Sequence, residues 1–199
     1  MKRTDDNVRG FTLLELMLVV AVLAVISSMA IPAVLNTTRQ IKLAANARAV
    51  ERELQGARMK AVRSNRAIRV RFNCPATGQY RMVELLGSKQ TPATDDDDSR
   101  AATRCGYSSY PFPDTNQDFF SIPNNDGPIQ TLQDGIGFGT DAQTVEFWPD
   151  GTAHVAAGGT QPWPAITGEG VGITVFDIMH QSTIVTSIGV NGLGKIALH

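Results

Sequence analysis

The chain has 199 residues, of which 42% are hydrophobic, 19% are charged and 7% are aromatic. This apolar content is enough for a sizeable core, so it excludes a wholly disordered chain, and the length fits one domain with an appended segment. The formal net charge is −1, but it is unevenly distributed. Residues 1–38 carry no net charge, residues 39–71 carry +8 (ten basic, two acidic) and residues 72–199 carry −9 (five basic, fourteen acidic). The sequence therefore divides into a neutral start, a basic stretch and an acidic body.

An apolar run of 25 residues, Phe11 to Leu35, contains a single charged residue, Glu15. A bilayer core of about 30 Å requires about 20 apolar residues in a helix, so this run is long enough to span one. Residues 1–10 include three basic residues, which favours a cytoplasmic leader and an extracytoplasmic body. An uncleaved signal anchor and a secretory signal peptide cut after Ala30 are two ordinary alternatives.

Glu15 argues against both alternatives. An acid inside a membrane-spanning helix costs about 2.5–3.5 kcal/mol on insertion scales, and such a residue usually has a partner. If the chain were cut after Gly10, the new amino terminus at Phe11 would lie one helical turn from Glu15. The carboxylate would also lie in the first turn, where the helix dipole favours a negative group. Cleavage at this point would therefore give an expensive isolated acid a charge partner.

Residues 9–16 read RGFTLLEL, which resembles the leader junction of type IV pilins and type II secretion pseudopilins. The resemblance implies that a membrane prepilin peptidase cleaves between Gly10 and Phe11 and methylates the amine of Phe11. It also implies that Glu15 pairs with the amino terminus of a neighbouring subunit. Pro32 matches a helix-interrupting proline of pilins. We therefore expect four segments, namely a leader (1–10), the membrane and assembly half of a helix (11–35), its amphipathic half (36–65) and a globular domain (66–199).

The helix is expected to continue beyond the membrane, because apolar residues recur at alternating steps of four and three and so form one face. These residues are Leu43, Ala47, Val50, Leu54, Ala57 and Ala61. We expect one helix from Phe11 to about Ser64, kinked or loosened at Pro32 because proline removes a backbone donor and clashes with the preceding turn. Arg58 lies near the boundary between the two faces. The opposite face, called the basic face below, contains Lys42, Arg48, Arg52, Lys60, Arg63 and Arg66.

Three interpretations of the basic face remain open. It is a solvated surface, a contact for the acidic body of the next subunit, or a site for DNA phosphates in a filament that takes up DNA. The candidate contact residues are Arg48, Arg52, Lys60, Arg63 and Arg66. DNA binding is the least favoured of the three, because the body is acidic and no aromatic residues alternate with the arginines to stack on bases.

From about residue 66 the sequence pattern changes from helical to strand-like. Turn residues separate the alternating segments, at 75–78, at 149–151 and at Asn191-Gly192, a strong hairpin signal. Together they predict a mostly antiparallel sheet of about seven strands, covered by the apolar face of the helix, in an α+β fold. The resemblance implies that this fold is pilin-like. The expected strands are 66–72, 79–86, 143–148, 152–156, 171–178, 183–190 and 193–198.

The C-terminal half strengthens the family assignment. Residues 145–151 read VEFWPDG and are followed by the strand segments GITV, IGV and GKI. This order resembles the GspH/FimT group of minor pilins and pseudopilins, in which an F-x-P-x-G turn precedes two hairpins, although the match is divergent between Ser88 and Asp141. The resemblance favours a minor subunit over a major pilin.

Residues 87–141 are rich in Gly, Pro, Asn, Asp and Ser and are expected to be irregular, with the glycine-rich residues 135–139 as turns. A calcium site at Asp95–Asp98 is a weaker interpretation than a solvated loop, since the spacing of an EF-hand is absent. Cys74 precedes this segment and Cys105 lies within it, so the two cysteines enclose its first part. An exported body allows a disulfide between them, and free buried thiols are the alternative.

The search for catalytic motifs gives no pattern of nucleophile and base, no phosphate loop and no metal-ligand spacing. We therefore expect no enzyme activity, no cofactor and no metal. The resemblance implies a structural minor pilin or pseudopilin of a bacterial inner membrane, with other pilin subunits and the prepilin peptidase as partners. A DNA-binding pilus subunit and a single-pass or secreted binding protein unrelated to filaments remain alternatives.

Overall fold

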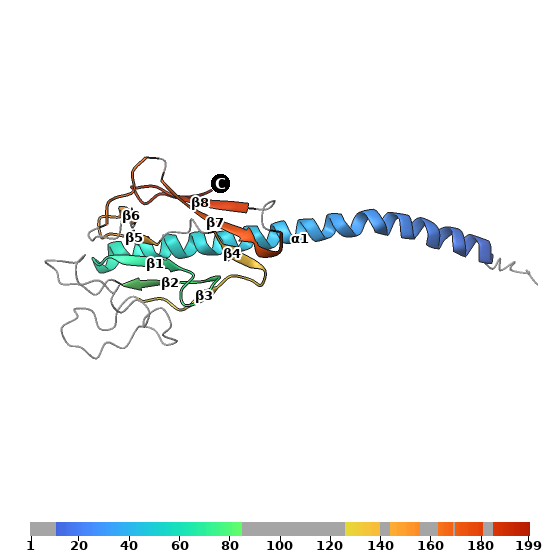
Figure 1. The fold of residues 1–199 in the computed structure, drawn as a ribbon, viewed down its shortest axis with the longest axis horizontal. Coiled ribbons are helices and arrows are strands. Elements are labelled where there is room, and N and C mark those ends of the chain that lie inside the picture. Colours follow the sequence, from blue (N-terminus) through green and yellow to red (C-terminus); the bar gives the residue numbers. More distant parts are fainter. Residues whose placement is uncertain (1–10, 85–125, 140–143, 156–162, 169, 181–184) are drawn as a thin grey trace, which may run out of the picture. The chain divides into compact units, whose positions relative to one another are not determined.

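A computed structural model provides the structure of the chain, in which the chain divides into two compact units, Met1–Gln40 and Ile41–His199 (Figure 1). We describe each unit separately. The described elements of the chain are one long α-helix, a short 3₁₀ segment and β-strands. The residues that the structure describes are 11–84, 126–139, 144–155, 163–168, 170–180 and 185–199.

The helix α1 extends from Leu13 to Ser64, and the expectation of one long helix is confirmed. Thr12 caps its start, since the Thr12 Oγ1 accepts a hydrogen bond from the Glu15 N–H at 3.2 Å. At the other end Asn65 adopts a left-handed backbone (φ 54°), and the Arg66 N–H donates to the Ala61 carbonyl at 3.2 Å. This is the closing bond of a Schellman motif. Pro32 lies inside the helix, which continues on both sides of it.

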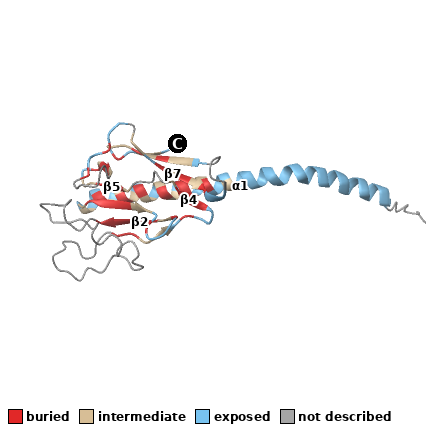
Figure 2. Ribbon diagram, viewed as in Figure 1, coloured by how far each residue is buried: buried red, intermediate tan, exposed pale blue. Residues whose placement is uncertain are grey.

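The part of α1 in the first unit buries none of its side chains. Every residue from 11 to 38 is exposed, although most are apolar (Figure 2). The helix contains an 18-residue window with a mean hydropathy of 2.6, and it is long and apolar enough to cross a membrane. Because exposure of apolar surface to water is unfavourable, this surface requires a partner from outside the unit.

The part of α1 in the second unit buries one face. All six residues that the periodicity predicted are buried there, from Leu43 to Ala61. Asn46 joins them because its amide is satisfied at both ends. Its Nδ2 donates to the Lys42 carbonyl at 2.7 Å, and its Oδ1 accepts from the Gln133 N–H at 2.9 Å.

The described residues contain nine strands in two sheets, whereas the sequence predicted one sheet of about seven. The first sheet has the order β3-β2-β1-β5-β6 and the second the order β4-β7-β8-β9, and every pairing is antiparallel. The strands are β1 (Ile68–Phe72), β2 (Gln79–Glu84), β3 (Gln130–Thr131), β4 (Ile136–Phe138), β5 (Val145–Phe147), β6 (Ala153–Val155), β7 (Val171–Asp177), β8 (Val185–Val190) and β9 (Ile196–Leu198).

Both sheets contribute side chains to one core that includes the buried face of α1. Val70 and Phe147 come from the first sheet, and Ile173 and Ile188 from the second, while Leu54 comes from the helix. The α+β fold class, a long helix packed on antiparallel sheet, is therefore confirmed.

Two expectations about local structure are wrong. Ile136–Phe138, in the segment expected to form turns, is strand β4, because it pairs with β7 and all three residues are buried. The connection between β8 and β9 covers residues 191–195, so it is longer than a two-residue Asn-Gly turn. It is closed by a hydrogen bond from the Asn191 N–H to the Lys195 carbonyl at 3.1 Å and contains a glycine with positive φ, Gly194 (71°).

Candidate functional site

One residue predicted for processing, Phe11, and one predicted for assembly, Glu15, lie at the start of α1. Phe11 and Glu15 are both exposed at the helix start, where unpaired backbone N–H groups favour a negative charge. In the part of the chain that the structure describes, Glu15 makes no ion pair. Gly10 lies outside the described residues, so cleavage between Gly10 and Phe11 remains a prediction.

One apolar groove lies next to this turn along the helix. It has a volume of about 440 Å³ and is lined by Leu18, Ala21, Val22, Val25 and Ile26, all exposed. Ridges and grooves of this kind are the elements through which helices pack on one another. Pro32, the other predicted assembly residue, is exposed further along.

The basic face of the helix is less uniform than the sequence suggested. Arg48, Arg52 and Arg63 are exposed, whereas Lys60 and Arg66 are half-buried. The Arg66 Nε lies 3.9 Å from the Oε1 of Glu84, a fully buried carboxylate. Three of the five candidate contact residues are therefore directed at solvent, and the other two are partly used within the domain.

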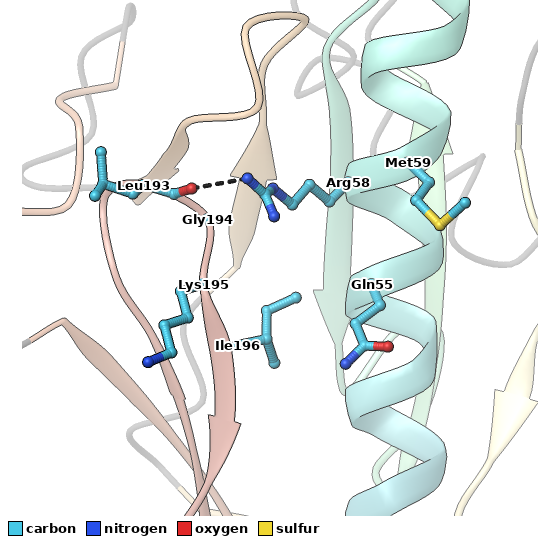
Figure 3. Close-up of a pocket in the computed structure, with 7 residues that line it drawn as sticks. All are labelled: Gln55, Arg58, Met59, Leu193, Gly194, Lys195 and Ile196. Carbon is cyan, nitrogen blue, oxygen red and sulfur yellow. Dashed lines mark hydrogen bonds between the residues drawn. The ribbon is translucent and has the colours of Figure 1, made fainter.

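Arg58, which the sequence placed at the edge of the basic face, connects the helix to both sheets. Its Nε donates to the Gly151 carbonyl at 3.1 Å, in the turn between β5 and β6. Its Nη2 donates to the Leu193 carbonyl at 3.0 Å, in the loop between β8 and β9 (Figure 3). Gly194 packs so tightly here that a Cβ would lie 2.6 Å from the Arg58 Nε. Periodicity could not reveal this role, because both acceptors are backbone atoms distant in sequence.

A second set of residues that the sequence analysis missed lies on the first sheet. Arg69 and Glu146 are both buried and form an ion pair at 3.0 Å between neighbouring strands. The Trp148 Nε1 donates to the other oxygen of Glu146 at 2.6 Å. The Arg69 guanidinium lies 3.8 Å from the ring centroid of Trp163, a cation–π contact. These contacts satisfy two charges that would otherwise be costly to bury.

The hairpin of β5 and β6 extends this network. The His154 ring stacks on Trp148 with centroids 4.3 Å apart, its Nδ1 is 2.8 Å from the Trp163 carbonyl, and its Nε2 is 2.9 Å from the Thr152 Oγ1. The hydroxyl and the N–H of Thr152 both donate to Asp150. These hydrogen bonds lower the pKa of Asp150 below its ordinary value. The arrangement orders the hairpin.

Two further titratable groups face each other where the helix packs on β2. Burial raises the pKa of Glu53 above its ordinary value, and the nearby Lys60 opposes this in part. Burial, together with the Glu53 charge, raises the pKa of Tyr80 to about 12. Among the described residues there is no group of three or more His, Cys, Asp or Glu side chains placed to hold a metal ion.

Of the two cysteines and the aspartate run, only Cys74 lies within the described residues. Cys74 is buried and disulfide-bonded. The only other cysteine of the chain, Cys105, lies outside the described residues, so the predicted Cys74–Cys105 pairing stays a prediction. Asp95–Asp98 also lies outside the described residues.

Comparison with known families identifies the N-terminal segment. Residues 5–31 match the family model of the prokaryotic N-terminal methylation motif. The chain has the N-terminal segment of a type IV pilin-like protein. The match spans the Gly10–Phe11 bond and includes Glu15, so the resemblance seen at residues 9–16 is confirmed. The motif and the apolar helix together indicate a membrane-anchored protein.

Two solved structures are similar to the chain. One, the minor pseudopilin EpsH from the type 2 secretion system of Vibrio cholerae, is 13% identical and has a TM-score of 0.44, with 79% of this chain and 96% of that chain covered. A crystal structure of the same pseudopilin is 11% identical, with a TM-score of 0.42 and coverage of 80% and 94%. These similarities are too distant to carry a conclusion about function. No curated protein sequence matches the chain.

Proposed function

We propose that the chain is a structural minor subunit that primes or caps a pilin-type filament, either a type IV pilus or a type II secretion pseudopilus. A prepilin peptidase removes residues 1–10 and methylates the amine of Phe11. The helix at 11–35 anchors the subunit in the bacterial inner membrane, with the C-terminal body on the periplasmic side. The subunit later leaves the bilayer and enters the filament through the same helix.

The observation that carries this proposal is the exposure of an apolar helix that bears the methylation motif. Residues 11–38 are all exposed, whereas the same helix buries its face from Leu43 onward. At about 25 cal/mol per Å², this much apolar surface requires lipid or other helices around it. A filament core of packed helices provides that environment, and so does the membrane before assembly.

Glu15 supplies the register in this proposal. Glu15 is in the first turn of α1, four residues after the amino terminus that cleavage would create at Phe11. In an apolar environment the Coulomb attraction between an amine and a carboxylate is much stronger than in water. A neighbouring subunit that brings its own amine to Glu15 neutralises the charge and fixes the axial position of the two helices.

The test replaces Glu15 with a neutral side chain of the same shape. We expect Glu15→Gln to be cleaved and methylated like the wild type but to be lost from the filament fraction after co-expression with its assembly system. Glu51→Gln, the same change in the second unit of the helix, is the matched control and should be incorporated normally. Normal incorporation of Glu15→Gln would remove the proposed role of the carboxylate.

DNA binding has less support than filament assembly. Only Arg48, Arg52 and Arg63 of the candidate contacts are exposed, and the body is acidic. Affinity that depends on phosphate contacts falls steeply with salt. Retardation of DNA by the full chain at about 50 mM salt, lost in Arg48→Ala/Arg52→Ala, would favour the DNA-binding alternative.

A further inference from the structure

One outer edge of the second sheet, at β9, pairs with no other strand among the described residues. β9 is last in the order β4-β7-β8-β9 and pairs only with β8. Ser187 and His199 exchange two backbone hydrogen bonds, of 2.8 and 3.3 Å. Hydrogen-bonded pairs alternate along an antiparallel ladder, so Gly189 and Ala197 form the next one. The backbone groups of Ile196 and Leu198 therefore point away from β8.

These outward groups have no partner in the part of the chain that the structure describes. Ile196 and Leu198 together offer two N–H donors and two C=O acceptors along one edge. Such an edge is a template for another strand unless it is covered. Their side chains also share a face of β9, because side chains alternate along a strand.

A cavity lies beside this edge. Its volume is about 360 Å³, and it lies between Gln55, Arg58 and Met59 of the helix and residues 193–196 of the loop and β9 (Figure 3). Met59 is 64% exposed and Leu193 is 76% exposed, so the rim is apolar. A strand added to β9 would direct alternate side chains toward this cavity, which is large enough for one aliphatic or aromatic group.

The charge at the cavity is positive. Arg58 and Lys195 line it, and none of its other lining residues is charged. Bonds to the Gly151 and Leu193 carbonyls hold the Arg58 guanidinium in place and leave its Nη1 without a described hydrogen bond. The Lys195 backbone is fixed by the Asn191 Oδ1 at 2.8 Å, and its side chain is exposed. A carboxylate is the complementary group for this pair of cations.

We propose that the β9 edge and this cavity are a docking site for an extended, acidic segment of another protein chain. The segment adds to the sheet as a strand through Ile196 and Leu198. It inserts one large apolar side chain between Met59 and Leu193 and presents a carboxylate to Arg58 and Lys195. The site requires neither cleavage after Gly10 nor the pairing of Glu15, and it therefore goes beyond the proposed function.

The test uses the full chain in detergent micelles and a seven-residue peptide with glutamate and valine around a central phenylalanine. In the free protein the amides of Ile196 and Leu198 should exchange faster than that of Ala197. With the peptide at about ten times its dissociation constant, exchange at both should slow by about tenfold. A peptide with lysine in place of glutamate is the control and should give no protection.

Two variants test the edge and the charge separately. Leu198→Pro removes an outward donor and leaves the bonds to β8, so peptide binding should be lost while the Ala197 amide stays protected. Lys195→Glu should weaken binding at least about tenfold, whereas Arg48→Glu, the same charge change on the basic face, should not. Unchanged binding by Leu198→Pro or by Lys195→Glu would overturn the proposal. Equal binding of the lysine peptide, or amide protection that grows with protein concentration alone, would also overturn it.

Discussion

The two parts of α1 differ in what covers their apolar residues. From 11 to 38 every side chain is exposed, while Leu43 to Ala61 form a face that is buried under both sheets. One helix therefore contains a part that is satisfied within its own unit and a part that needs a partner from outside. Mutations in the two parts should have different consequences, on folding in one and on insertion and assembly in the other.

The largest effect is expected within the self-contained unit. Arg69→Met leaves Glu146 buried without its ion-pair partner, so it should reduce the free energy of unfolding by about 3–5 kcal/mol. Urea unfolding of the full chain in detergent, followed by tryptophan fluorescence, measures this, because the only tryptophans of the chain are Trp148 and Trp163. Arg63→Met, at an exposed helix position, is the control. A loss as small as that of the control would show that the pair contributes little.

The contrast within the helix is tested by two identical substitutions. Leu54→Ala removes a fully buried side chain and should cost about 2–5 kcal/mol. Leu23→Ala removes one that is 56% exposed in the apolar run and should leave the urea transition of the body unchanged. Equal destabilisation by the two variants would show that the first part of the helix is buried by the body, contrary to the comparison.

Arg58 should have an intermediate effect. Arg58→Met loses the bonds to the Gly151 and Leu193 carbonyls and should cost about 1.5–3 kcal/mol by the same urea measurement. Arg48→Met, on the basic face, is the matched control and should be close to neutral. Arg58→Lys should not restore the loss fully, since an ammonium cannot donate in the same fixed fork. Full restoration by lysine would show that the stabilisation comes from the positive charge and does not require the two-pronged geometry of the guanidinium.

The smallest effect is a dependence on pH at Glu53. Burial raises the pKa of Glu53, so the folded state bears the cost of a desolvated charge above that pKa and loses the cost when the group is protonated. Glu53→Gln should therefore stabilise the fold at about pH 7 by less than about 1 kcal/mol and have a smaller effect at about pH 4. Paired urea unfolding curves at both pH values measure this. A stabilisation that is larger at the lower pH would contradict the assigned direction.

Local sequence patterns correctly predicted the features that depend on residues close together in the chain. The buried face from Leu43 to Ala61 follows from helical periodicity, and the turn at Pro149-Asp150-Gly151 follows from residues that favour tight turns. Gly10, Phe11 and Glu15 were predicted from one contiguous segment, residues 9–16, and their roles stay predictions. The separation into two sheets was not predicted, since strand order depends on distant pairings such as β1 with β5.

The buried charges were missed for the same reason. The alternation in Arg69-Val70-Arg71 correctly directs Val70 to the core, but it suggests that the arginines face water. The Glu146 partner of Arg69 is 77 residues away, and no local pattern connects the two. Arg58 was likewise assigned to the edge of the basic face from its position on the helix. Its hydrogen-bond partners are backbone carbonyls of two loops that are distant in sequence.

The mature amino terminus tests the central claim most directly. The claim is that the exposed apolar half of α1 becomes an assembly helix once cleavage creates an amine near Glu15. Mass spectrometry of the chain purified from its assembled form should find residues 1–10 absent and one methyl group on Phe11. A chain that still begins at Met1, or one that begins at Ile31, would contradict the account.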